Sequence, residues 1–297
     1  MHIIRHLNPQ LQPLALAIGN FDGMHMGHAA LIRSLVEAAK NQNLTPAVMT
    51  FEPHPREFFS PQNAPARLSS LREKLEWLCE ASVETILLRR FNQPFAQMSA
   101  PDFINVLHQL NVKAILVGED FRFGAKRAGG VADFSANGFE LIPMPRIDLN
   151  EERVSSTRVR NALATGNLKL AKTLLHRDYS ISGKVVHGEK RGRKLGFPTA
   201  NIHMRHERPA LTGVYAVKLE GLAAVANLGV RPTINGIPKL MLEVHVLDYQ
   251  GDLYGKHVHV AFLHKIRDEM KFASLDDLKA QIAQDILVAR DYFKKTT

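Results

Sequence analysis

Two histidines, at positions 25 and 28, stand where an apolar stretch gives way to a helical pattern. Residues 14–18 are apolar enough for a buried parallel strand, and Gly19 with the turn residues 20–23 ends that strand. Gly27 lets the backbone close on a ligand. At the start of the helix that follows, free backbone N–H groups meet the positive end of the helix dipole. The stretch therefore predicts a phosphate site in which His25 and His28 stabilise negative charge.

A second polar group lies in the segment VSSTRVR, residues 154–160. Ser155, Ser156 and Thr157 can each cap a helix, so a well-capped helix start is one interpretation. The other is functional: hydroxyl groups, a helix N-terminus and Arg160 one turn later together suit a polyphosphate. The residues alone leave both interpretations open.

The third group lies in residues 183–202, where a glycine-flanked basic loop leads to Thr199 and Asn201. These two side chains alternate, so in an extended segment they face the same side. A hydroxyl and an amide oxygen suit Mg²⁺ that is held together with nucleotide phosphates. Further on, Glu243 interrupts a strand whose other inward positions we expect to be apolar. An inward carboxylate is costly unless it is paired, so we expect a general base for phosphoryl transfer, with a salt-bridged structural glutamate as the alternative.

The elements that must position these residues fall into two parts. Up to residue 177, strand-like runs alternate with helical patterns, which predicts an α/β domain with a parallel sheet and right-handed crossovers. From residue 179, short strand-like runs are separated by glycine and proline turns, which predicts an antiparallel barrel or sandwich. An amphipathic helix follows Ser274. We therefore predict two domains, residues 1–177 and residues 178–297.

Loops at the carboxyl ends of parallel strands are where such sheets place ligands. The first of these, FEPHPREFF at 51–59, contains two prolines and is expected to be a rigid loop and not a helix. Its His54 and Phe58 suit a planar ring, although we expect one of Phe58 and its neighbour Phe59 to lie in the core. The loop after the strand at 113–117 carries Asp120 at the same edge.

Composition limits the class of protein. The chain has 297 residues, 45% hydrophobic and 23% charged residues and a net charge of +9, which favours anionic partners such as phosphorylated small molecules or nucleic acid. No apolar run reaches the length of a membrane span, and residues 1–10 lack the apolar core of a signal peptide, so we expect a cytoplasmic protein. The single cysteine, Cys79, excludes an intramolecular disulfide and lies on an apolar helical pattern that predicts burial.

The motifs resemble those of a known family. His25-Met26-Gly27-His28 is similar to the first signature of the nucleotidylyltransferase superfamily, and SSTRVR is similar to its second. The longer strings GNFDGMHMGH, GFPTAN, GVYAV, NLGVRPT, LEVHVLD, GDLYGK and RDEMKFASLDDL resemble, in order and over essentially the whole chain, the prokaryotic bifunctional riboflavin kinase/FAD synthetases. That resemblance implies a Rossmann-like FMN adenylyltransferase domain, followed by a six-stranded riboflavin kinase barrel and a C-terminal helix.

The resemblance also implies roles for individual residues. In the adenylyltransferase, His25, His28 and Arg160 would act in catalysis, and the ATP would contact Gly19, Phe21, Gly27, Ser155, Ser156 and Thr157. FMN would contact His54, Phe58 and Asp120. In the kinase, Gly183, Lys184 and Lys190 would bind ATP, Thr199 and Asn201 would hold Mg²⁺, and Glu243 would be the base. The expected partners are riboflavin, FMN and ATP, without nucleic acid or membrane, and the oligomeric state is not predicted.

Two other functions compete with this interpretation. One is a different nucleotidylyltransferase with an accessory barrel, acting for example on a pantetheine or nicotinamide phosphate. GFPTAN and Glu243 argue against it, because an accessory barrel needs no magnesium site. The other is a basic nucleic-acid-binding protein, which steep salt dependence of oligonucleotide binding would support. Its aromatic residues are dispersed and do not interleave with a basic stripe, which counts against it.

Overall fold

The computed structural model describes residues 1–6, 12–188, 196–204, 208–231 and 239–296. The chain divides into two compact units. The first comprises residues 1–65 and 71–155, and the second comprises residues 66–70 and 156–297. Among the described residues, no helix is both long and apolar enough to cross a membrane.

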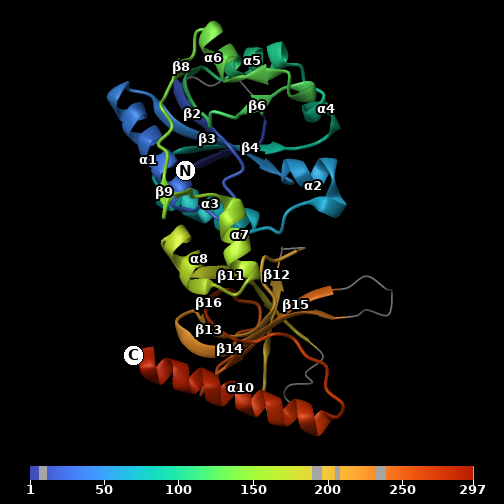
Figure 1. The fold of residues 1–297 in the computed structure, drawn as a ribbon. Helices are drawn as coiled ribbons and strands as arrows, with labels where there is room; N and C mark the ends of the chain where they lie inside the picture. The colour runs from blue at the N-terminus through green and yellow to red at the C-terminus, as the bar shows by residue number, and fades with distance from the viewer. Residues whose placement is uncertain (7–11, 189–195, 205–207, 232–238, 297) are drawn as a thin grey trace. The chain divides into compact units, whose positions relative to one another are not determined.

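The first unit is built on a six-stranded parallel sheet (Figure 1). The strand order is β1-β4-β3-β2-β5-β8, with β1 His2–Ile4, β2 Leu14–Ile18, β3 Thr45–Glu52, β4 Thr85–Arg90, β5 Val112–Leu116 and β8 Glu140–Leu141. All five strand pairs are parallel, which confirms the predicted α/β class. Because β2 is central and both of its faces are covered, all five of its residues are buried.

Helices complete the first unit. The longer ones are α1 Met26–Asn41, α3 Leu71–Glu80, α5 Ala100–Gln109 and α6 Val131–Ala136. Alternate β2 residues belong to two separate hydrophobic clusters, with Leu16 in one and Ala17 in the other, as expected for a sheet covered on both faces. The short elements are α2 Pro55–Phe59, α4 Gln93–Ala96, β6 Arg122–Phe123, β7 Gly129–Gly130, β9 Asp148–Leu149 and β10 Glu152–Arg153.

Three local expectations were wrong in this unit. The segment expected to be a rigid loop contains the helix α2, because Pro55 occupies its first turn, where no hydrogen-bonded N–H is needed, and His54 caps it. Cys79 is exposed and not buried. It lies next to the fully buried Leu78 near the end of α3, and the helical repeat turns it outward. Neither Phe58 nor Phe59 is a core residue, since Phe58 is half-buried and Phe59 is exposed.

The second unit contains a closed antiparallel barrel, so the sandwich alternative is excluded. The barrel order is β11-β12-β15-β14-β13-β16, with β11 Tyr179–Val186, β12 Ala200–Met204, β13 Gly213–Leu219, β14 Leu222–Arg231, β15 Lys239–Val246 and β16 His257–Arg267. The helices α7 Ser156–Ala164 and α8 Leu168–Leu175 precede it, and α10 Leu275–Thr296 follows it. Figure 1 shows α10 lying across the barrel, where Ala289 packs with Val214, Ala216 and Val225.

Candidate active sites

The loop between β2 and α1 is fixed in an unusual conformation. Phe21 and Met24 have positive φ angles of 49° and 40°, and both side chains are buried. Left-handed backbone is unfavourable for residues with a side chain, and it persists only where the surroundings impose it. Asp22 and His25, in the same loop, are also buried. The loop predicted to receive a phosphate is therefore well packed, and its backbone conformation is fixed by the surrounding side chains.

The two histidines lie together at the start of α1. His25 is the N-cap, and its Nδ1 accepts a hydrogen bond from the backbone N–H of His28 (3.3 Å). The imidazole rings stack with centroids 3.7 Å apart, and the ring of Phe21 lies 5.3 Å from that of His28. A Cβ on Gly27 would lie 3.2 Å from the ring of His25 and 3.6 Å from the carbonyl oxygen of Val154. Gly27 thus permits close packing of the helix start against both His25 and Val154.

Lys74 on α3 is a buried charged residue beside the loop after β2, and it belongs to none of the motifs predicted from the sequence. Its ammonium group is buried and donates to Oγ1 of Thr50 (3.4 Å), which in turn donates to the carbonyl oxygen of Asn20 (3.3 Å). These bonds tie the loop after β2 to β3 and α3. The signal was present, because Lys74 follows Leu71 by three residues and precedes Leu78 by four, which places a charged residue on the buried face of the helix.

The predicted FMN residues follow the carboxyl ends of the strands that flank β2. His54 caps α2, and its Nδ1 accepts from the backbone N–H of Arg56 (3.1 Å). Phe58 packs edge-on against Phe59 and Phe91, with ring centroids 5.3 Å and 5.6 Å away. Asp120 is exposed in the loop after β5. Because β3 and β5 are the neighbours of β2, their loops and the histidine loop share one edge of the sheet.

The second predicted phosphate segment begins α7, as its capping residues predict. Ser156 is the first residue of this helix, which belongs to the second unit, whereas Ser155 is the last residue of the first unit. Arg160 is half-buried, and its Nε donates to the carbonyl oxygen of Ala66. Thr157 is exposed.

The predicted kinase base lies on the outer face of the barrel. Leu242, Val244 and Val246 are buried, whereas Glu243 and His245 alternate with them and are only half-buried. The expectation that Glu243 occupies an inward position was therefore wrong. The two-residue period of β15 gives the interior to its apolar neighbours and turns Glu243 outward, under α10.

Glu243 lines a cavity of about 580 Å³, here called the acceptor cavity. Its polar barrel residues are Thr199, Asn227, Glu243 and His245. The remaining lining residues are Phe197, then Val214, Val225 and Arg267 of the barrel strands, Glu269, Met270 and Phe272 after β16, and Leu275, Leu278, Ile282, Asp285 and Ile286 of α10. The cavity thus combines apolar side chains with several polar groups, which is typical of a small-molecule site.

An ion pair between half-buried Arg267 and buried Asp285 holds α10 to the barrel at this cavity. Arg267 forms a bidentate pair with Asp285, with Nε 2.9 Å from Oδ1 and the second guanidinium nitrogen 2.8 Å from Oδ2. Gln281 donates a further hydrogen bond to Asp285 (2.9 Å). The guanidinium carbon of Arg267 also lies 5.7 Å from the ring centroid of Phe272. The charges are therefore mutually satisfied before any ligand binds.

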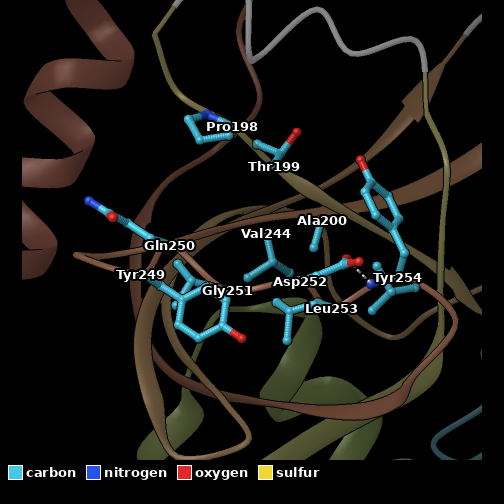
Figure 2. Close-up of a pocket in the computed structure, with 12 residues that line it drawn as sticks. Pro198, Thr199, Ala200, Val244, Tyr249, Gln250, Gly251, Asp252, Leu253 and Tyr254 are labelled. Atoms are coloured by element: carbon cyan, nitrogen blue, oxygen red, sulfur yellow. Dashed lines mark hydrogen bonds between the residues drawn. The ribbon is translucent and has the colours of Figure 1, made fainter.

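A second cavity of about 550 Å³, here called the mouth cavity, opens beside the first. Figure 2 shows Pro198 and Thr199 on one side of it and the loop from Tyr249 to Tyr254 around it. The Tyr254 ring lies 4.0 Å from that of His187. Thr199 lines both cavities, so it marks the point where they meet.

The other predicted kinase residues are placed as follows. Asn201 is buried, and its amide lies over Gly188, where any Cβ would collide with it. Gly183 is a buried residue of β11 that leaves no space for a side chain against β12. Lys184 is exposed on β11, and Lys190 lies outside the described residues.

Comparison with known proteins identifies both parts of the chain. Residues 7–158 match the family model of FAD synthetase, and residues 175–293 match that of riboflavin kinase. The bifunctional riboflavin kinase/FMN adenylyltransferase of Escherichia coli K12 is 48% identical, over 95% of this chain and 93% of that protein. The enzyme of the same name from Haemophilus influenzae is 45% identical, over 99% of both chains.

A solved structure from Streptococcus pneumoniae, titled a macrolide-efflux protein, has the same fold. It superposes with a TM-score of 0.81 at 32% identity and covers 98% of this chain and 99% of its own. The identities and the two family matches each extend over the motifs that carried the resemblance, and they confirm the predicted family. This chain belongs to the bifunctional riboflavin kinase/FMN adenylyltransferases, which phosphorylate riboflavin to FMN and adenylylate FMN to FAD.

Proposed function

We propose that riboflavin binds in the acceptor cavity, that ATP binds in the mouth cavity, and that the phosphoryl group passes between them beside Thr199. The observation that carries this assignment is that Thr199 lines both cavities, whereas Glu243 lines only the acceptor cavity. The apolar residues of α10 and the ring of Phe272 suit the planar isoalloxazine ring.

In this proposal Glu243 is the general base. Its carboxylate takes the proton of the terminal ribityl hydroxyl, and that oxygen forms a bond to the γ-phosphorus of ATP. The bond between the γ-phosphorus and the β,γ-bridging oxygen breaks, and ADP leaves. Glu243 suits this role because none of the other described residues forms an ion pair or hydrogen bond with its carboxylate.

We assign Mg²⁺ to Thr199 and Asn201. Enzymes of both kinds act on ATP with a divalent metal ion, and hydroxyl and amide oxygens are ligands of the type that Mg²⁺ accepts. Asn201 directly opposes Glu243 across β12 and β15, so the amide is held close to the proposed base. When bound, the ion neutralises charge on the transferred phosphate. Gly183, Lys184 and Lys190 are assigned to ATP.

For the adenylyltransferase, we propose that the phosphate of FMN is itself the nucleophile. Its oxygen bonds to the α-phosphorus of a second ATP, the α,β-bridging bond breaks, and pyrophosphate leaves. His25, His28 and Arg160 stabilise the charge that develops on the phosphates. Gly19, Phe21, Gly27, Ser155, Ser156 and Thr157 shape the ATP site, and His54, Phe58 and Asp120 orient FMN.

We further propose that the functional domains comprise residues 1–177 and 178–297, and that the enzyme acts in the cytoplasm on small molecules, without nucleic acid or membrane. The family models end at residue 158 and begin again at residue 175, which supports a functional boundary in this region.

The test is a pair of variants in the full chain. We expect Glu243→Gln to lower FMN formation by about 10²-fold or more, because a general base contributes that much, and to leave FAD formation from added FMN near normal. His28→Ala should lower FAD formation by roughly 10²-fold and spare the kinase. His108→Ala, an exposed histidine of the first unit, is the matched control and should change neither activity. A Glu243→Gln variant that forms FMN at the normal rate would refute the assignment.

A further inference from the structure

The strand register places a third polar side chain beside the proposed base. Asn227 on β14 directly opposes Glu243 on β15, and Glu243 directly opposes Asn201 on β12. Directly opposed residues project from the same face of a sheet. Asn201, Glu243 and Asn227 therefore form a row across three neighbouring strands, here called the polar row, and its last two members line the acceptor cavity.

Distance and exposure make Asn227 available to Glu243. Opposed residues of antiparallel strands have Cβ atoms roughly 4.5–5.5 Å apart, which is within the reach of an amide and a carboxylate. Asn227 is exposed in the cavity, and within the described part of the chain its amide has no hydrogen-bond partner. The amide of Asn201, in contrast, is buried against Gly188. Asn227 is thus the member of the polar row that is free to respond to a bound acceptor.

We propose that Asn227 is a positioning residue of the kinase, whose side-chain amide donates a hydrogen bond to the Glu243 carboxylate when riboflavin is bound. The inference rests on the proposed role of Glu243. One carboxylate oxygen then accepts from Asn227, while the other remains directed at the ribityl hydroxyl. The donor thereby fixes the orientation of the carboxylate that takes the proton.

The charged groups around the cavity show why a neutral donor is needed here. His245 lies on β15, and Arg267 is already paired with Asp285 of α10. The Glu269 carboxylate lies over Gly229, two residues beyond Asn227 on β14, where a Cβ would displace it. Glu243 therefore shares its cavity with the Glu269 carboxylate. A carboxylate at position 227 would have no N–H to donate and would repel Glu243.

The experiment compares Asn227→Asp and Asn227→Ala with the native enzyme, measuring kcat and KM for FMN formation. Asn227→Asp retains the size of the side chain but removes the donor amide opposite Glu243, so it should lose as much kcat as Asn227→Ala, with little change in the KM for riboflavin. Both variants should lower kcat by roughly tenfold at neutral pH and leave FAD formation from added FMN unchanged.

Two further variants make the result decisive. Gln284→Glu, on the exposed side of α10, adds the same charge outside the cavity and should leave kcat unchanged. A native kcat in Asn227→Asp would overturn the inference, as would an equal loss in Gln284→Glu or a loss of kcat that only follows a lower melting temperature. Glu243→Gln is measured in parallel. If it is inactive while Asn227→Asp behaves as native, only the inference about Asn227 fails; if it is fully active, the proposed base fails as well.

Discussion

Because Gly27 has no side chain, the His25 ring can pack closely against the start of α1. The position that a Cβ would take lies 3.2 Å from the His25 ring, and that ring is stacked on His28. The packing is tight enough that even one methyl group must displace the imidazole. Gly27 therefore controls the histidine pair through space and not through backbone flexibility, since it is a residue of the helix α1.

We predict that Gly27→Ala lowers FAD formation by roughly tenfold or more, because it displaces His25 from the charge-stabilising position. Thermal stability should not fall, since alanine favours a helix by about 0.5–1 kcal/mol over glycine. Assays of both activities with a melting curve check this. Ala30→Gly is the control, because it weakens the same helix without filling space. Normal FAD formation in Gly27→Ala would separate the histidine geometry from catalysis.

At the residue scale, the sequence predicts chemistry better than orientation. The spacing of His25 and His28 was sufficient to place them together, because a helix start fixes both. Glu243 was identified by its contrast with apolar neighbours, but that contrast does not say which face of a strand is the interior. Asn227 could not be found at all from the sequence, since only the register of β14 against β15 brings it to Glu243.

At the scale of elements, two bidentate ion pairs fix α10 to the barrel. Asp285 is 3% exposed, and its partner Arg267 ends β16. An exposed pair joins Arg290 of α10 to Asp248, after β15. A planar guanidinium–carboxylate pair favours one position of the helix, and the Arg267–Asp285 pair does so at the acceptor cavity.

We predict that Asp285→Ala lowers the free energy of unfolding of the barrel by about 1.5–3 kcal/mol, because the half-buried Arg267 loses its charged hydrogen-bond partner. Asp291→Asn is the matched control. That aspartate pairs with Lys295 on the exposed side of the same helix, and its loss should cost less than about 0.5 kcal/mol. Urea denaturation of the full chain measures both, and equal effects would contradict the importance of the Arg267–Asp285 pair.

Tyr215, on strand β13, makes the stability of the folded chain depend on pH. Burial, followed by the charge of Asp268, raises the pKa of Tyr215 from 10.0 to about 12. The folded chain therefore holds this proton more tightly than the unfolded chain does. The stabilisation is complete below pH 10 and is lost as the pH rises through 12.

We predict that Tyr215→Phe is less stable than the native protein near neutral pH by about 1 kcal/mol, because it loses the hydrogen bond to the carbonyl oxygen of Thr212. This difference should shrink as the pH rises from 10 to 12, since only the native chain loses the Tyr215 stabilisation in that range. Urea midpoints at several alkaline pH values test the prediction. Parallel curves for the two proteins would contradict it.

For the whole molecule, the change from alternating strands and helices to strands alone was enough to predict two architectures. The short strand β1 was missed, because His2–Ile4 is too short to show a period and is defined by its pairing with β4. Closure of the barrel could not be distinguished from a sandwich, because it depends on the pairing of β11 with β16 over a long sequence separation. Local patterns do not encode such pairings.

The central claim is that one chain performs two reactions with two separate sets of residues. The most direct measurement incubates Glu243→Gln and His28→Ala, separately and mixed, with riboflavin, ATP and Mg²⁺, and separates the flavins over time. We expect that Glu243→Gln alone leaves riboflavin unconverted and that His28→Ala alone stops at FMN. The mixture should form FMN first and FAD afterwards, as the native enzyme does. Loss of both activities in either single variant, or a mixture that makes no FAD, would contradict it.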